Sequence, residues 1–161
     1  MGKLKTDFQK VTEVELVYRN RLKIEDRQQI SSSVDAYELF SLVWDYDKIE
    51  LQEQFKIMLL DNKNTCLGIV SIAVGGINYC PVDAKLVFAA ALKARATGII
   101  LAHNHPTGNL TFSVSDKTLI ADFQEVAKIL GISILDHLII TSHGYRSLSD
   151  DGVLPPIHLK M

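Results

Sequence analysis

Residues 99–116 read IILAHNHPTGNLTFSVSD, and the interpretation of the whole sequence starts from this stretch. It begins as a short apolar run, which predicts a buried strand. In a strand, positions i and i+2 face the same side, so His103 and His105 can converge on one point in space. Pro106 and Gly108 then end the strand and predict a turn. The stretch therefore carries two imidazoles to the end of a strand.

Asp116 lies where a helix is predicted to begin, directly after that turn. Two histidines and one carboxylate form a three-ligand set that suits a catalytic zinc, which keeps its fourth position for water. Ser113 and Asp116 also have the spacing of a helix capping box, and the residues alone leave both interpretations of that pair open. His-x-His by itself is a weak signal, because exposed strands can carry two histidines without any function.

The complete string, His-x-His-Pro, six residues, Ser, two residues and Asp, resembles the motif of the JAMM (MPN or JAB) metallohydrolases. The segment LAHNHPTGN at residues 101–109 resembles one branch of that family in particular, the RadC-like proteins. The likeness continues upstream through residues 53–55 and 59–61, and downstream through residues 135–140 and 145–152. It covers most of the chain after about Ile30.

The resemblance implies a single JAMM/cytidine-deaminase-like domain of the α/β (α+β) class, with a mixed β-sheet flanked by helices. It implies a zinc ion held by His103, His105 and Asp116, which would acidify a bound water and polarise a substrate carbonyl. Glu53 matches the glutamate that accepts and relays the proton of that water in these enzymes. Ser113 matches the residue that donates a hydrogen bond to the oxyanion, a role compatible with capping.

Other polar side chains are weaker candidates for the site. Glu50 is the near competitor of Glu53, but strand alternation puts it on the opposite face. His137 lies inside an apolar strand and is predicted to be a core residue or to support a metal ligand. His143 and His158 are explained by exposure in a loop and a tail. Cys66 and Cys80 lack the spacing of metal ligands and are either thiols or a disulfide.

The composition is that of a globular protein, with 161 residues, 47% apolar residues and a net charge of −2. This size is sufficient for one hydrophobic core, and the charge argues against a large basic surface for nucleic acid. Acidic residues are interleaved with the lysines and arginines of the first 27 residues, which favours a solvated face. No signal-like or membrane-spanning apolar run is present, so we expect a cytoplasmic protein with no membrane partner.

The predicted elements follow the order strand, helix, hairpin, helix, strand, helix, strand, strand. Their predicted ranges are 11–18, about 33–45, 55–60 with 65–74, 81–96, 99–103, 114–130, 132–140 and 145–148. Ser33 or Asp35 is expected to cap the first helix, with Asp35 and Glu38 as its capping box. The organisation predicted is an N-terminal strand and charged extension at 1–30, a RadC-like JAB/MPN domain at 31–154, and a tail at 155–161.

Three functions are compatible with the sequence. A zinc metallopeptidase or isopeptidase, acting on a peptide or on a protein with an isopeptide-like tail, is favoured by the presence of every motif residue. A DNA repair or DNA-processing accessory, or a metal-dependent nuclease, is the first alternative, although the acidic balance is against it. A binding module that uses its metal only for stability is the second. The sequence leaves the scissile bond and the oligomeric state open.

Overall fold

Five strands form one mixed sheet in the computed structural model, which describes residue 12 and residues 14–157. The strands are β1 (Gln54–Leu60), β2 (Cys66–Val74), β3 (Gly98–Asn104), β4 (Ser133–Thr141) and β5 (Gly144–Ser147). Their spatial order is β2-β1-β3-β4-β5. Strands β3 and β4 are parallel, and the other neighbours are antiparallel. The predicted fold class, an α/β domain with a mixed sheet flanked by helices, is confirmed.

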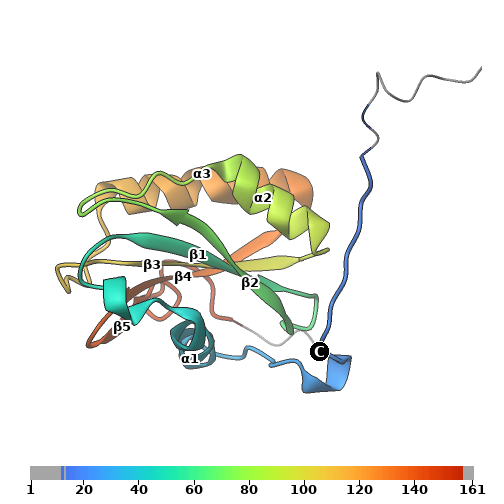
Figure 1. The fold of residues 1–161 in the computed structure, drawn as a ribbon, viewed down its shortest axis with the longest axis horizontal. Coiled ribbons are helices and arrows are strands. Elements are labelled where there is room, and N and C mark those ends of the chain that lie inside the picture. The colour runs from blue at the N-terminus through green and yellow to red at the C-terminus, as the bar shows by residue number, and fades with distance from the viewer. Residues whose placement is uncertain (1–11, 13, 158–161) are drawn as a thin grey trace, which may run out of the picture.

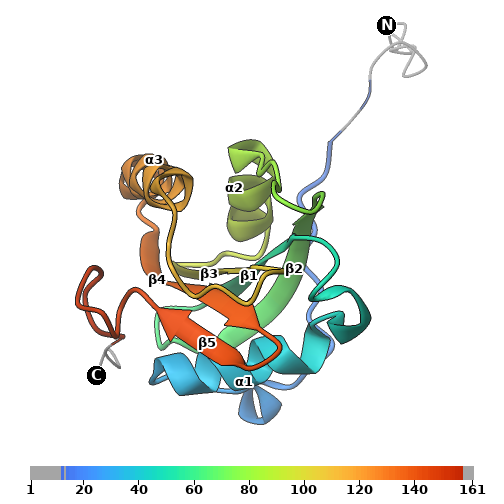
Figure 2. The same cartoon turned by 90° about the vertical axis from the view of Figure 1, so that its left-hand side faces the viewer.

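Helices cover both faces of this sheet. The helices α2 (Ala84–Lys93) and α3 (Val114–Leu130) lie on one face, and α1 (Ser33–Val43) lies on the other (Figures 1 and 2). Two short 3-10 helices, η2 (Ile24–Asp26) and η3 (Tyr46–Lys48), flank α1 in the chain. Every residue of the central strands β1 and β3 is buried. Both faces of these strands therefore belong to the core.

Strand alternation assigns each buried side chain to one of two cores. Ile99 and Leu101 of β3 pack with α2 and α3, whereas Ile100 and Ala102 pack with α1. By the same alternation, His103 emerges on the face covered by α2 and α3, and Asn104 on the face covered by α1. The side chains of the last two residues of β3 thus lie on opposite faces of the sheet.

The first helix begins with a different cap from the one expected. Ser32, in extended backbone, accepts a hydrogen bond from the Asp35 amide at 3.3 Å, and the Asp35 carboxylate accepts one from the Ser32 amide at 3.0 Å. The capping box is therefore Ser32–Asp35, and the prediction of Ser33 or Asp35 as the cap was wrong. The Ser33 hydroxyl instead donates to Asp150 at 2.6 Å.

The second helix is shorter than predicted at both ends. It begins after Asp83, whose side chain accepts from the Lys85 amide at 2.9 Å, because the residues from Pro81 to Asp83 are not helical. It ends at Lys93, where Arg95 adopts a left-handed φ of 59°. Gly98 was predicted to stop this helix but is the first residue of β3. A Cβ there would lie 2.7 Å from Leu135 Cδ1, so glycine permits close packing.

The strand predicted at residues 11–18 is not present in its described part. Residues 14–18 have no regular secondary structure, and Val14 and Leu16 are exposed. A strand requires a hydrogen-bonding neighbour, and these residues pair with no strand of the described sheet. Residues 11 and 13 lie outside the described part of the chain. The predicted division into residues 1–30, 31–154 and 155–161 stays a prediction. Over residues 12 and 14–157, no helix combines the length and apolar character needed to cross a bilayer.

Candidate metal centre

The end of β3 and the start of α3 bring the three predicted ligands together. The Nε2 atoms of His103 and His105 are 2.9 Å apart. Asp116 Oδ1 lies 3.4 Å from His103 Nε2, and its Oδ2 lies 3.8 Å from His105 Nε2. One ligand atom from each residue fits within 4.8 Å of the others. The turn between strand and helix therefore folds a carboxylate back onto both imidazoles.

His105 is oriented by its own turn. Its Nδ1 lies 2.6 Å from the carbonyl oxygen of Asn109, and a carbonyl can only accept, so Nδ1 carries the proton and donates it. In the neutral ring this leaves the lone pair on Nε2, the atom that faces His103 and Asp116. The Gly108 amide, which donates to the His105 carbonyl at 2.9 Å, closes the same turn. The turn sets the tautomer that metal binding requires.

Asp116 both caps α3 and faces the histidines. Its Oδ2 accepts from the Ser113 amide at 2.7 Å, while Ser113 Oγ accepts from the Asp116 amide at 3.1 Å. Oδ1 stays directed toward His103. The two interpretations that the sequence left open are thus compatible, because the capping box holds the carboxylate at the cluster. Asp116 is half-buried, with 18% of its side chain exposed.

His103 lies in a buried aromatic environment and contacts a third histidine, His137. Its Nδ1 lies 2.7 Å from His137 Nε2, and the rings of Phe55 and Phe112 pack around both imidazoles. Burial lowers the pKa of His103 to about 4, against the opposing effect of Asp116. Burial also holds the pKa of His137 well below its usual value. Both rings are therefore neutral near pH 7, as metal ligation by His103 requires.

His137 is the supporting residue of His103, one of the two roles the sequence predicted, but it is not fully satisfied. Its Nδ1 is buried and has no hydrogen-bond partner among the described residues. When His103 binds a metal through Nε2, its Nδ1–H must be the donor to His137 Nε2, and His137 then carries its proton on the unpartnered Nδ1. A buried unsatisfied donor is costly and typical of functional sites.

Glu53 immediately precedes β1 and lines the same pocket as the three ligands. Burial raises the pKa of its carboxyl group; His105 opposes this rise and Asp116 adds to it. Its amide donates to the Gly76 carbonyl at 2.9 Å, and its carbonyl accepts from the Gly75 amide at 2.8 Å. The competitor Glu50 accepts a hydrogen bond from Ser142 Oγ at 2.6 Å and lies outside this pocket. The structure thus places Glu53, not Glu50, beside the cluster.

The pocket over the cluster has a volume of about 200 Å³, and its far wall was not predicted from the sequence. That wall comes from the segment between β2 and α2, through residues Asn78, Tyr79, Cys80 and Val82. Gly75 makes the tight turn into this segment, because a Cβ there would lie 2.2 Å from the Tyr79 carbonyl oxygen. A Gly-Gly pair after a strand signals the turn, but nothing local in the sequence shows what it faces.

Of the remaining candidates in the described part of the chain, Cys80 lines the pocket, whereas Cys66 and His143 lie outside it. Cys66 and Cys80 are free thiols rather than a disulfide. Burial raises the pKa of Cys80, and the nearby Glu53 carboxylate adds to this rise. His143 lies in the turn between β4 and β5, outside the pocket, and His158 lies outside the described residues.

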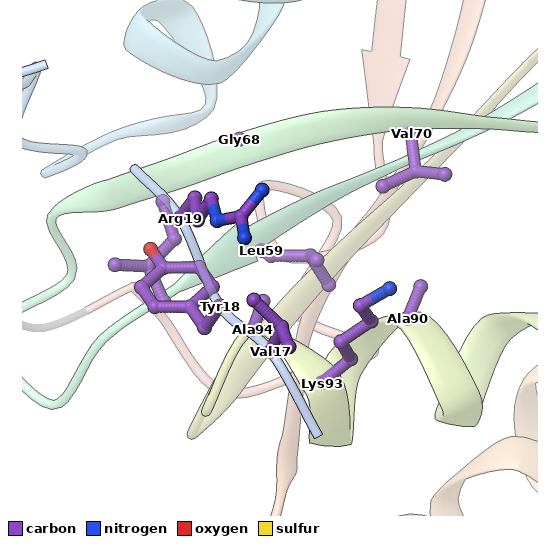
Figure 3. A pocket seen from close by; sticks show the side chains of 10 residues that line it. Val17, Tyr18, Arg19, Leu59, Gly68, Val70, Ala90, Lys93 and Ala94 are labelled. Carbon is purple, nitrogen blue, oxygen red and sulfur yellow. The ribbon is translucent and has the colours of Figure 1, made fainter. Parts of the chain in front are cut away.

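A larger groove, of about 530 Å³, lies at the other end of β1 (Figure 3). Residues 17–19 pass over it between the strands and α2. Leu59, Gly68 and Val70 line it from the sheet, and Ala90, Lys93 and the following Ala94 line it from α2 and its C-terminal end. None of the predicted site residues lines this groove, and its charged side chains are those of Arg19 and Lys93. It therefore lacks the donor set of the candidate metal centre.

The donor set fits zinc. Four ligands at about 2.0–2.1 Å in a tetrahedron are separated from one another by about 3.3 Å. The two Nε2 atoms are 2.9 Å apart, and the Asp116 carboxylate approaches His103 to 3.4 Å through Oδ1 and His105 to 3.8 Å through Oδ2. Two imidazole nitrogens and one carboxylate oxygen are also ligands that zinc accepts, whereas calcium and magnesium prefer all-oxygen shells. Among the described residues three ligands converge, which leaves a fourth position for water or substrate.

A mixed sheet with a His-x-His strand end and a capping aspartate defines the class of JAB-type domains, and comparison with known sequences agrees. Residues 30–153 match the family described as the RadC-like JAB domain. The chain belongs to this family.

Several relatives carry the name UPF0758 protein. The one from Flavobacterium johnsoniae is 38% identical over 145 residues, which cover 89% of this chain and 62% of the relative. The one from Pelobacter propionicus is 40% identical over 116 residues, covering 70% and 51%, and the one from Methanosarcina mazei is 37% identical over 130 residues, covering 80% and 55%. The chain thus spans about half to three fifths of these relatives' length.

Proposed function

We propose that this domain is a zinc-dependent hydrolase of peptide or isopeptide bonds. The observation that carries the proposal is the convergence of His103, His105 and Asp116 in a pocket that also holds one carboxyl group and one hydroxyl group. Zinc held by the three ligands would supply Lewis-acid chemistry, by acidifying a water and polarising the scissile carbonyl. The chain's own groups then have to move one proton and stabilise one oxyanion.

Glu53 is suited to the proton transfers. Its carboxyl group lies in the pocket near His105 and Asp116, and burial keeps its pKa above the usual value. A carboxylate with a raised pKa is a stronger base, and its conjugate acid can return the proton to a leaving amine. We therefore assign to Glu53 the acceptance of the water proton and its delivery to the amine nitrogen.

Ser113 is suited to stabilise the oxyanion. Its Oγ uses a lone pair to accept from the Asp116 amide, so its hydroxyl proton stays available for donation. The side chain lines the pocket and is held by the capping box, which fixes the donor before the reaction. A donor fixed in this way is worth about 3 kcal/mol of transition-state stabilisation in other hydrolases.

The substrate consistent with this pocket is a peptide or an isopeptide-linked protein tail. Phe55, Tyr79, Val82 and Leu119 give the pocket apolar walls, and the ligands and Glu53 form its polar floor. Such walls exclude bulk water and accept the aliphatic part of a peptide.

The test uses zinc-loaded protein, a mixed peptide library and mass spectrometry of the products. The proposal predicts cleavage by the unaltered protein, a loss of about 100-fold or more in Glu53→Gln with zinc content unchanged, and normal cleavage in Glu50→Gln. Glu50→Gln is the matched control, because it removes a nearby exposed carboxylate outside the pocket. Equal cleavage by the two variants, or cleavage by neither those variants nor the unaltered protein, would contradict the proposal.

A further inference from the structure

We propose that Asn104 is a positioning residue that holds the loop bearing Glu53 against the metal ligands. This inference rests on the proposed function for the role of Glu53, but the hold itself is a property of the fold. Asn104 stands between the two histidine ligands in the sequence and is completely buried. Its side chain is directed to the opposite face of β3, away from the ligand cluster.

The side chain makes three hydrogen bonds, all to the backbone of one loop. Asn104 Oδ1 accepts from the Gln54 amide at 2.7 Å. Asn104 Nδ2 donates to the Ile49 carbonyl at 2.7 Å and to the Gln52 carbonyl at 3.0 Å. Two of these partners are the residues directly before and after Glu53. The backbone on both sides of Glu53 is thereby fixed to β3.

A primary amide is the group that matches these partners. The loop presents one N–H donor and two carbonyl acceptors, and the asparagine side chain offers one acceptor and two donors. An aspartate of the same shape would place a second oxygen against the two carbonyls and leave them without donors. Serine is too short to span all three partners. The buried site therefore selects asparagine by hydrogen-bond complementarity.

Glu53 itself is held from the other side by the two glycines that follow β2. Its amide and carbonyl pair with the backbone of Gly76 and Gly75. Asn104 and this Gly-Gly pair hold the backbone around Glu53 from two sides, and the Glu53 side chain lines the pocket of the three predicted ligands. Because Asn104 lies between His103 and His105 in the chain, one residue ties the proton-transfer group to the ligand pair.

The test compares Asn104→Asp, and Asn104→Ser in case the first fails to fold, with Thr141→Val. Thr141 is also buried, and its hydroxyl donates to the Gly144 carbonyl at 3.1 Å and accepts from the His143 amide at 3.3 Å. Its variant therefore loses buried side-chain hydrogen bonds that involve none of the backbone groups bonded by Asn104. The readouts are amide hydrogen exchange at Gln54 by NMR, zinc content, and hydrolysis of the peptide selected above.

The proposal predicts that the Asn104 variants keep one zinc per chain, while exchange at Gln54 becomes roughly tenfold faster or more. It also predicts that kcat falls by about 100-fold with KM changed by less than about threefold, as for Glu53→Gln. Thr141→Val should resemble the unaltered protein in all three readouts. Unchanged exchange at Gln54 overturns the proposal, and so does loss of zinc with the loop intact.

The two proposals fail differently. If the unaltered protein cleaves no peptide, the proposed function fails, while exchange and zinc content still decide whether Asn104 holds this loop. If the unaltered protein is active and the Asn104 variants keep full activity despite faster exchange, the positioning role fails and the proposed function stands.

Discussion

At the scale of single residues, the site depends on which nitrogen of each histidine carries a proton. The Asn109 carbonyl sets this for His105, and His137 is placed to set it for His103. Sequence patterns located both histidines of the candidate metal centre, because His-x-His at a strand end is a local signal. They could not show that the His137 Nδ1 would be left without a partner, because that depends on the packing of Phe55 and Phe112.

Replacing His137 should weaken zinc binding. In His137→Phe the Nδ1–H of His103 loses its acceptor, so the tautomer needed for ligation is no longer favoured, and we expect affinity to fall about 10- to 100-fold. His137→Gln, whose side-chain oxygen can accept a hydrogen bond, should recover part of the loss. Competition with a fluorescent zinc chelator measures both constants. Equal affinity in His137→Phe and the unaltered protein would show that His137 does not orient His103.

The stability of the metal-free protein should fall as the pH drops from 6.5 toward 4. The unfolded chain protonates His103 near its ordinary pKa of 6.5, whereas the folded protein resists protonation until about pH 4. Proton binding therefore favours the unfolded state in this window, by roughly 3 kcal/mol in total, and has no such effect above it. Urea denaturation in the presence of a chelator measures the slope, which should become shallower in His103→Gln. Identical slopes would contradict this origin.

At the scale of elements, α3 was predicted with its observed bounds, because neighbouring residues in the sequence signal both of its ends. Ser113 and Asp116 form the capping box, and Gly131 adopts the left-handed conformation at φ 68° that ends the helix. The strand expected at 11–18 failed for the opposite reason: alternation gives a propensity, whereas a strand also needs a neighbour that only the fold supplies. The start of α2 failed because Pro81 is compatible with a first helical turn without requiring one.

The capping box of α3 should contribute to both stability and activity. Ser113→Ala removes the acceptor of the Asp116 amide and should cost about 1 kcal/mol of unfolding free energy. Ser32→Ala on α1 is the matched control, because it breaks the same kind of box far from the pocket. Chemical denaturation should give similar losses for the two variants, whereas only Ser113→Ala should reduce peptide hydrolysis. Equal activity in both variants would leave Ser113 as a cap alone.

At the scale of the whole molecule, the site joins segments that are far apart in the sequence. The motif predicted the three ligands, but Glu53 is the residue directly before β1. The pairing of β1 with β3 sets Phe55 opposite His103 and so brings Glu53 to the site. The pocket wall comes from the connection between β2 and α2. Family resemblance identified Glu53 in advance, whereas the wall and the Asn104 contacts emerge only from the packed sheet. The catalytic roles of Glu53 and Ser113 stay predictions.

Zinc should stabilise the fold as a whole. Its ligands link the end of β3 to the start of α3, and a ligand that binds only the folded state raises the unfolding free energy by about 2.7 kcal/mol at 100 times its dissociation constant. Thermal unfolding should therefore shift upward when zinc is added to chelator-treated protein, and the shift should vanish in Asp116→Asn. A shift that persists in that variant would place the zinc elsewhere.

The most direct test of the metal centre is native mass spectrometry of the purified protein beside its His103→Ala variant, each after zinc has been added and excess removed. The account predicts one zinc ion per chain in the unaltered protein and none in the variant. No bound metal in either protein, or equal zinc in both, would contradict the metal centre and with it the proposed hydrolase.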